Sequence, residues 1–63
     1  MTTISSNTLI RNEINYLDGL IQNLLDAGMD ELLFLDGGST DGTYEKLMQY
    51  SKENSKIVVL RWP

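Results

Sequence analysis

The feature that most constrains this chain is an apolar run that passes directly into an acidic, glycine-rich turn. Residues 32–35 are four large apolar side chains, and residues 36–43 read D-G-G-S-T-D-G-T, here called the acidic turn. A short apolar run closed by turn residues is typical of a strand buried on both faces of a parallel sheet. In open α/β sheets, ligands bind at the edge where such strands end. The sequence therefore predicts its functional site at the acidic turn.

Helical patterns lie on both sides of this strand. Apolar side chains recur at helical spacing from Ile14 to Leu25, and Gly28 is a typical residue to follow a helix end. Asn12 is the expected N-cap of this first helix. A second helix is expected to begin near residues 41–43, with Asp41 or Thr43 as its N-cap, and to end before residue 54.

Two further strands complete a β-α-β-α-β pattern. Residues 2–10 are β-branched but partly polar, residues 31–35 are the strand that holds the central apolar run, and residues 56–60 are expected to be a short buried strand. This alternation predicts an α/β fold, namely a three-layer half of a Rossmann-like parallel sheet. Right-handed crossovers place the second strand in the middle, which gives the strand order 3-2-1. The two outer strands then carry open edges that a partner chain could cover.

The length of 63 residues limits the chain to a single domain, 1–63. A chain this short buries only about 60% of its unfolded surface and is marginally stable by itself. It contains no cysteine and no histidine, so neither a disulfide nor a histidine-bound or cysteine-bound zinc can add stability. We therefore expect a homo-oligomer.

The charge and hydropathy exclude several classes of partner. The formal net charge of −4, with scattered lysines and arginines, argues against nucleic-acid binding, which needs a basic patch. The longest apolar runs are far shorter than the ~20 residues of a membrane span. The N-terminus lacks the basic and apolar regions of a secretory signal. We expect a cytoplasmic protein.

Several known site chemistries do not fit the acidic turn. Gly37 and Gly42 have the outer spacing of a phosphate-binding loop, but Thr43 stands where that loop needs lysine. The dinucleotide pattern G-x-G-x-x-G is absent, and glycine does not fall at the sixth position of a calcium loop. An aspartyl-phosphate phosphatase would need a second aspartate two residues after Asp36. Without histidine or cysteine, this chain alone cannot form a Ser-His-Asp or Cys-His arrangement.

The acidic turn resembles the nucleotide-sugar turn of the family 2 glycosyltransferases, commonly D-D-G-S-T-D-G-T. Residues 9–13, L-I-R-N-E, are similar to a V-R-N-E variant found at the end of that family's first strand. The resemblance covers nearly the whole chain but only the first third of a typical catalytic domain. It implies a GT-A fold and a UDP-sugar or another nucleotide sugar as the ligand.

The resemblance also assigns a nucleotide-sugar-binding set by position. Residues 9–13 would approach the nucleoside, with Glu13 and Asp36 as polar contacts, while Ser39 and Asp41 would shape the turn and cap the next helix. Gly37 departs from the family pattern, because an aspartate that often contacts the base stands there in relatives. The predicted binding residues are Leu9, Arg11, Glu13, Asp36, Gly37, Gly38, Ser39 and Asp41.

No catalytic residue or metal ligand is assigned in this chain. The resemblance places the family's D-x-D metal motif, catalytic base and acceptor site beyond residue 63, so Mn²⁺ or Mg²⁺ is expected only in a full-length relative. Sugar transfer of this kind needs an ion at the leaving diphosphate and a base at the acceptor hydroxyl. We therefore expect a truncated or minimal nucleotide-sugar-binding domain that is inactive alone.

A second hypothesis is a small oligomerising scaffold that kept the fold and lost ligand binding. Helix capping alone accounts for Asp41, and turn stabilisation alone accounts for Ser39 and Thr40. Under this hypothesis the open sheet edges become an interface. Tyr44, Tyr50 and Trp62 are interpreted as packing or interface residues rather than base-stacking platforms.

Overall fold

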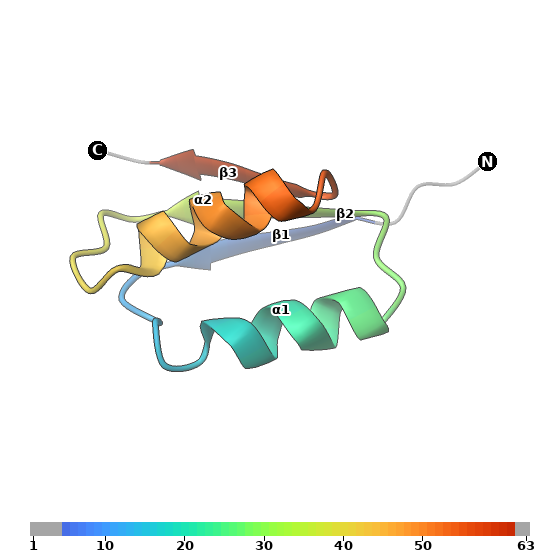
Figure 1. Cartoon of the computed structure of the whole chain (residues 1–63), viewed down its shortest axis with the longest axis horizontal. Helices are drawn as coiled ribbons and strands as arrows, with labels where there is room; N and C mark the ends of the chain where they lie inside the picture. Colours follow the sequence, from blue (N-terminus) through green and yellow to red (C-terminus); the bar gives the residue numbers. More distant parts are fainter. Residues whose placement is uncertain (1–4, 62–63) are drawn as a thin grey trace.

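A computed structural model describes residues 5–61 and shows three strands alternating with two helices (Figure 1). The elements are β1 (Ser5–Ile10), α1 (Leu17–Asp26), β2 (Glu31–Asp36), α2 (Thr43–Glu53) and β3 (Ile57–Arg61). The α/β prediction is confirmed. The expectations for residues 2–4 of the first strand and for Trp62 fall outside the described residues.

The three strands form one parallel sheet in the order β1-β2-β3, with β2 in the centre. This is the predicted order named from the β1 edge instead of the β3 edge. Ile10 pairs with Asp36, and Asp36 pairs with Arg61, so the last residues of the three strands lie side by side. The register therefore brings the acidic turn and the ends of both neighbouring strands to one edge of the sheet.

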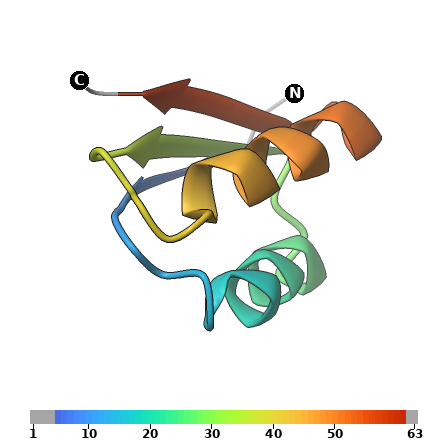
Figure 2. The ribbon, with the colours of Figure 1, turned by 60° about the vertical axis from the view of Figure 1, so that its left-hand side comes forward.

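Both helices lie on the same face of the sheet (Figure 2). The strand order advances in one direction, so each right-handed crossover lays its helix on the same side. The expected three-layer arrangement is therefore wrong for the described residues, which form two layers. The expectation that the central strand is buried on both faces is also wrong, since Leu32 and Phe34 are buried while Leu33 and Leu35 are only partly covered.

The core lies between this sheet face and the two helices. Alternate residues of the strands and the inner faces of the helices contribute to it, as expected for periods of two and 3.6 residues. The buried apolar side chains are Ile10, Leu17, Ile21, Leu32, Phe34, Leu47 and Ile57. The opposite sheet face carries exposed apolar side chains, among them Leu9 and Leu60.

The helix ends differ from the prediction at both N-termini. The helix α1 begins at Leu17 with Tyr16 at the N-cap position, and Asn12 instead adopts a left-handed φ of 52° in the preceding loop. The helix α2 has Gly42 at its N-cap position rather than Asp41 or Thr43. At the other end of α1, Gly28 has a φ of 79° and donates its N–H to the Leu25 carbonyl, as the sequence predicted.

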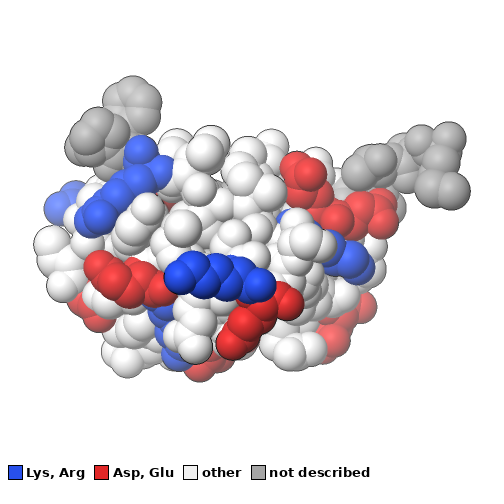
Figure 3. Space-filling model, turned by 45° about the horizontal axis from the view of Figure 1, so that its top comes forward, with Lys and Arg blue, Asp and Glu red and all other residues white. Residues whose placement is uncertain are grey.

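The surface carries charges of both signs. On the face shown in Figure 3, acidic and basic side chains are interspersed rather than separated. Between residues 5 and 61, neither helix has the length and apolar character needed to cross a membrane.

Candidate functional site

The candidate site lies where the β1–α1 loop, residues 11–16, meets the acidic turn. The Gly37 N–H donates to the Ile10 carbonyl at 2.8 Å, which extends the sheet pairing by one residue. Four further bonds then join the two segments, each from a backbone N–H of one segment to a side-chain oxygen of the other. The contacts are Asn12 N–H to Ser39 Oγ at 2.9 Å, Glu13 N–H to Thr43 Oγ1 at 3.0 Å, Ile14 N–H to Asp41 Oδ2 at 3.2 Å and Thr40 N–H to Asn12 Oδ1 at 2.8 Å. The two segments therefore form one hydrogen-bonded unit.

Asp36 is the buried centre of this unit. Its Oδ2 accepts the N–H groups of Gly38 at 3.1 Å and Ser39 at 3.0 Å, and its Oδ1 accepts the Ser39 hydroxyl. Burial by itself raises the pKa of this carboxyl, but the bonds from Ser39 and Gly38 and the charge of Arg61 outweigh it. The pKa of Asp36 is therefore lowered, and the carboxylate is ionised at neutral pH.

Asp41 performs a similar task at the exposed end of the turn. Its Oδ1 accepts both the N–H and the hydroxyl of Thr43, and its Oδ2 accepts the Ile14 N–H. The bond from the Thr43 hydroxyl is the main reason that the pKa of Asp41 is lowered. Asp41 thus ties the start of α2 to the β1–α1 loop, although it is not the N-cap residue itself.

The glycines of the turn differ in what they require. Gly38 and Gly42 have φ values of 89° and 97°, in the left-handed region that favours glycine. Gly37 has no such backbone constraint, and a Cβ placed on it would lie 3.6 Å from the Ile10 carbonyl oxygen and 3.7 Å from Arg11 Cβ. These are ordinary contacts, so the fold leaves room for a side chain at position 37.

The structure brings most of the predicted site residues together. Arg11 lies beside Gly37, and the backbone of Glu13 is bonded to Thr43, while the side chains of Arg11 and Glu13 are exposed. Leu9 is separated from them, because its side chain projects from the sheet face that the helices leave open.

Three residues that the sequence reasoning did not assign to the site belong to it. Asn12 accepts the Thr40 N–H, and Arg61 lies beside Asp36 with its guanidinium 4.3 Å from the centre of the Tyr44 ring. The sequence does contain a signal for Arg61. This residue directly follows the third apolar run, and since adjacent parallel strands end side by side, it is expected near the end of the central strand. The third strand was expected to end at residue 60, which left Arg61 outside it.

Five backbone N–H groups of the acidic turn already have protein acceptors, which limits the chemistry that the turn offers. The following backbone N–H groups donate to protein oxygens: those of Gly37, Gly38, Ser39, Thr40 and Thr43. These amides are therefore not free to cradle a phosphate in the manner of a phosphate-binding loop.

The described carboxylates do not fit a metal site. Asp36 and Asp41 both accept several hydrogen bonds from protein donors, as given above. Within residues 5–61, no cluster of three carboxylate, histidine or cysteine side chains is placed to hold a metal ion. We therefore derive no metal-dependent step from these residues.

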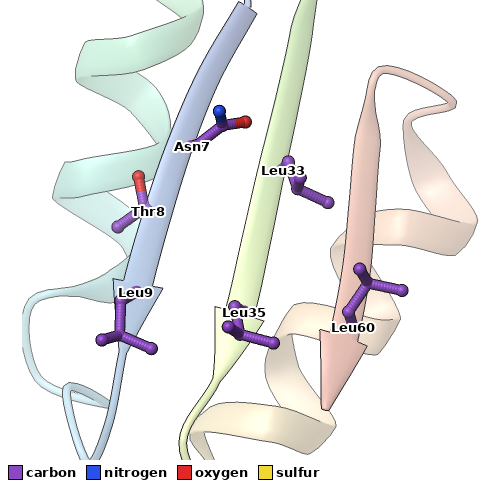
Figure 4. Close-up of a pocket in the computed structure, with 6 residues that line it drawn as sticks. All are labelled: Asn7, Thr8, Leu9, Leu33, Leu35 and Leu60. Carbon is purple, nitrogen blue, oxygen red and sulfur yellow. The ribbon is translucent and has the colours of Figure 1, made fainter. Parts of the chain in front are cut away.

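A hollow on the opposite sheet face is separate from this site. It is lined by Asn7, Thr8, Leu9, Leu33, Leu35 and Leu60 (Figure 4). Its lining is mainly aliphatic and carries no ionisable group, so it offers an apolar surface rather than a centre for chemistry.

Comparison with known proteins identifies the family. Neither the curated proteins nor the solved structures gave a significant match. The family model for glycosyl transferase family 2 matches residues 8–63, which include the β1–α1 loop and the acidic turn. Since that match spans most of the sequence, the chain belongs to glycosyl transferase family 2.

Proposed function

We propose that the β1–α1 loop and the acidic turn bind the nucleotide part of a nucleotide sugar, with a UDP-sugar as the first candidate. The observation that carries this proposal is the set of hydrogen bonds that joins the two segments at the carboxyl edge of the sheet. Open α/β sheets bind their ligands at this edge, and membership of glycosyl transferase family 2 supplies the ligand class.

The described residues have different roles in this proposal. Arg11 and Glu13 are exposed beside the turn and offer a cation and a carboxylate to the ligand. Asp36, Ser39 and Asp41 hold the turn in shape through the bonds given above. Asp36 therefore acts on the ligand by fixing the backbone of Gly38 and Ser39.

The proposed activity is binding without sugar transfer by this chain alone. Transfer needs a group that neutralises the leaving diphosphate and a base that deprotonates the acceptor hydroxyl. The carboxylates of the acidic turn are engaged as hydrogen-bond acceptors for backbone and hydroxyl groups, so they do not supply that base. Catalytic groups would come from outside residues 5–61.

The test is a titration of the ¹⁵N-labelled chain with UDP and UDP-glucose, with and without Mn²⁺, followed by amide chemical shifts. We expect shifts confined to residues 11–13 and 36–43, with residues 22–30 unchanged. Arg11→Ala should weaken the response, and Lys56→Ala, at the opposite end of the sheet, serves as the matched control. The absence of any shift at millimolar nucleotide would contradict the proposal.

A second candidate function is a scaffold that associates with a second copy of itself. The uncovered sheet face favours it, because Leu9 is 74% exposed and Leu60 is 53% exposed on that face. Large apolar side chains grouped on one exposed face are a feature of interaction surfaces. Under this candidate the acidic turn is structural, and the nucleotide titration gives no response.

A further inference from the structure

Arg61, like Arg11, is a cationic residue that the fold places beside the acidic turn. It is the last residue of β3 and pairs in register with Asp36, the last residue of β2. Its side chain lies on the same sheet face as Asp36 and the helix α2, because its guanidinium contacts groups from both. The carboxyl edge of the sheet thus carries a positive charge next to the proposed nucleotide site.

The orientation of the guanidinium is fixed by three contacts. Its carbon lies 4.3 Å from the centre of the Tyr44 ring, Nη2 donates to the Ser39 carbonyl at 3.4 Å, and Nε lies 3.6 Å from Asp36 Oδ2. Stacking on an aromatic ring holds the plane of the group, while the two polar contacts are long for hydrogen bonds. The arginine is therefore held in place without its hydrogen-bonding capacity being used up.

Most of the donors of Arg61 have no hydrogen-bond acceptor among the described residues. A guanidinium carries five N–H donors, and the bond to Ser39 uses one of them. The side chain is 44% exposed, whereas that of Asp36 is fully buried and accepts shorter bonds from Gly38 and Ser39. Asp36 balances part of the charge of Arg61 but does not occupy its outward N–H groups.

The phosphates of a bound nucleotide would need such donors. The amides of residues 37–40 already donate to protein oxygens, so these four cannot perform this task. Of the three lysines, Lys46 is paired with Asp18, Lys52 lies in the last turn of α2, and Lys56 lies at the opposite end of the sheet. A planar guanidinium is well suited to phosphate because it can donate two parallel hydrogen bonds.

We propose that Arg61 binds the diphosphate of the nucleotide sugar, with Tyr44 as the residue that positions its guanidinium. This role rests on the proposed function of the site, and it makes Arg61 the phosphate-binding group of that site. Arg11, on the far side of Gly37, is then left for the nucleoside end of the ligand.

The chain makes a direct test simple, because Arg11 and Arg61 are its two arginines. Their side-chain Nε–Hε signals can be assigned by Arg11→Lys and Arg61→Lys and then followed in titrations with uridine, UDP and inorganic pyrophosphate. We expect UDP and pyrophosphate to shift the Arg61 signal and uridine to leave it unchanged. Arg61→Met should weaken UDP binding about tenfold, as expected for the loss of a charge-assisted hydrogen bond, and leave uridine binding unchanged.

Variants of Tyr44 and Arg61 separate phosphate binding from a structural role. Tyr44→Phe keeps the ring and should bind UDP as the parent does, whereas Tyr44→Leu should weaken UDP binding. Arg61→Lys keeps the charge and should restore part of the affinity lost in Arg61→Met. Equal weakening of uridine and UDP in Arg61→Met, together with shifted amides of Gly38 and Ser39 before ligand is added, would show a structural role and overturn the proposal.

Failure of this proposal is distinguishable from failure of the proposed function. If UDP shifts residues 11–13 and 36–43 while the Arg61 signal stays in place and Arg61→Met binds UDP normally, only the role of Arg61 is overturned. If neither UDP nor uridine produces any response, the nucleotide site itself is contradicted, and the role of Arg61 falls with it.

Discussion

Asp36 shows how one buried carboxylate can organise a binding turn. It accepts hydrogen bonds from two successive backbone N–H groups and one hydroxyl, and a cation lies beside it. The side chain of an asparagine at this position has one oxygen, which could accept only part of these bonds. Its NH₂ group would then point at N–H or O–H donors. We therefore expect Asp36→Asn to lower the free energy of unfolding by about 1–3 kcal/mol, the usual effect of leaving a buried polar group unsatisfied. Urea unfolding at pH 7 measures this, with Asp26→Asn as a control on an exposed aspartate.

The same carboxylate predicts an acid-sensitive fold. Hydrogen bonds from Ser39 and Gly38 outweigh the effect of burial and hold the pKa of Asp36 below that of an unfolded aspartate. Its contribution is therefore complete above the unfolded pKa of about 3.9 and is lost as the pH falls through the lower folded pKa. Urea unfolding at pH 7, 4 and 3 should show stability falling with pH, and falling less in Asp36→Asn. An identical pH dependence in the two proteins would contradict this role.

The neighbouring glycines provide a matched pair of substitutions. Gly38 has a φ of 89° with open space around it, whereas Gly37 lacks a left-handed φ and has room for a Cβ. Gly38→Ala should lower the free energy of unfolding by roughly 1–2 kcal/mol through backbone strain, while Gly37→Ala should be nearly neutral. Equal losses in thermal or urea unfolding would contradict the role of the left-handed backbone conformation at Gly38.

At the level of elements, the sequence predicted the type of every described helix and strand. It did so because their apolar periods agree with the faces that they bury, as in Leu17 and Ile21 of α1. It failed at the helix starts, because Asn12 and Asp41 look like caps but also hold the two segments together through bonds from Thr40 and Ile14. Those bonds join residues about 28 positions apart, and local sequence patterns carry no information about them.

Helix α1 offers a test of how much its buried face contributes. The side chain of Ile21 is almost completely buried, whereas Gln22 next to it is exposed. Ile21→Val should lower the free energy of unfolding by about 0.5–1.5 kcal/mol and Ile21→Ala by about 2–5 kcal/mol. A domain of 63 residues has a free energy of unfolding of only about 3–9 kcal/mol, so the alanine variant should lose a large part of its stability. Gln22→Ala is the control, and circular dichroism with urea distinguishes the variants.

At the level of the whole molecule, the strand order was predicted correctly and the number of layers was not. β2 lies in the centre, and with this strand order right-handed crossovers put both helices on one face. The run from Leu32 to Leu35 reads as a strand covered on both faces, yet Leu33 and Leu35 face the uncovered side. The strands therefore carry more apolar side chains than the described helices cover.

This uncovered face predicts association at high concentration. Leu9 and Leu60 are exposed on it, and β1 and β3 each have an unpaired edge within the described residues. We expect light scattering to give a mass above the 7.1 kDa of one chain at high concentration and to approach that value on dilution. The double variant Leu9→Thr, Leu60→Thr suits a strand and removes apolar surface that the monomer does not bury, so it should stay monomeric at higher concentration and remain folded. A parent chain that is folded at 7.1 kDa throughout the dilution series would show that the face needs no second copy.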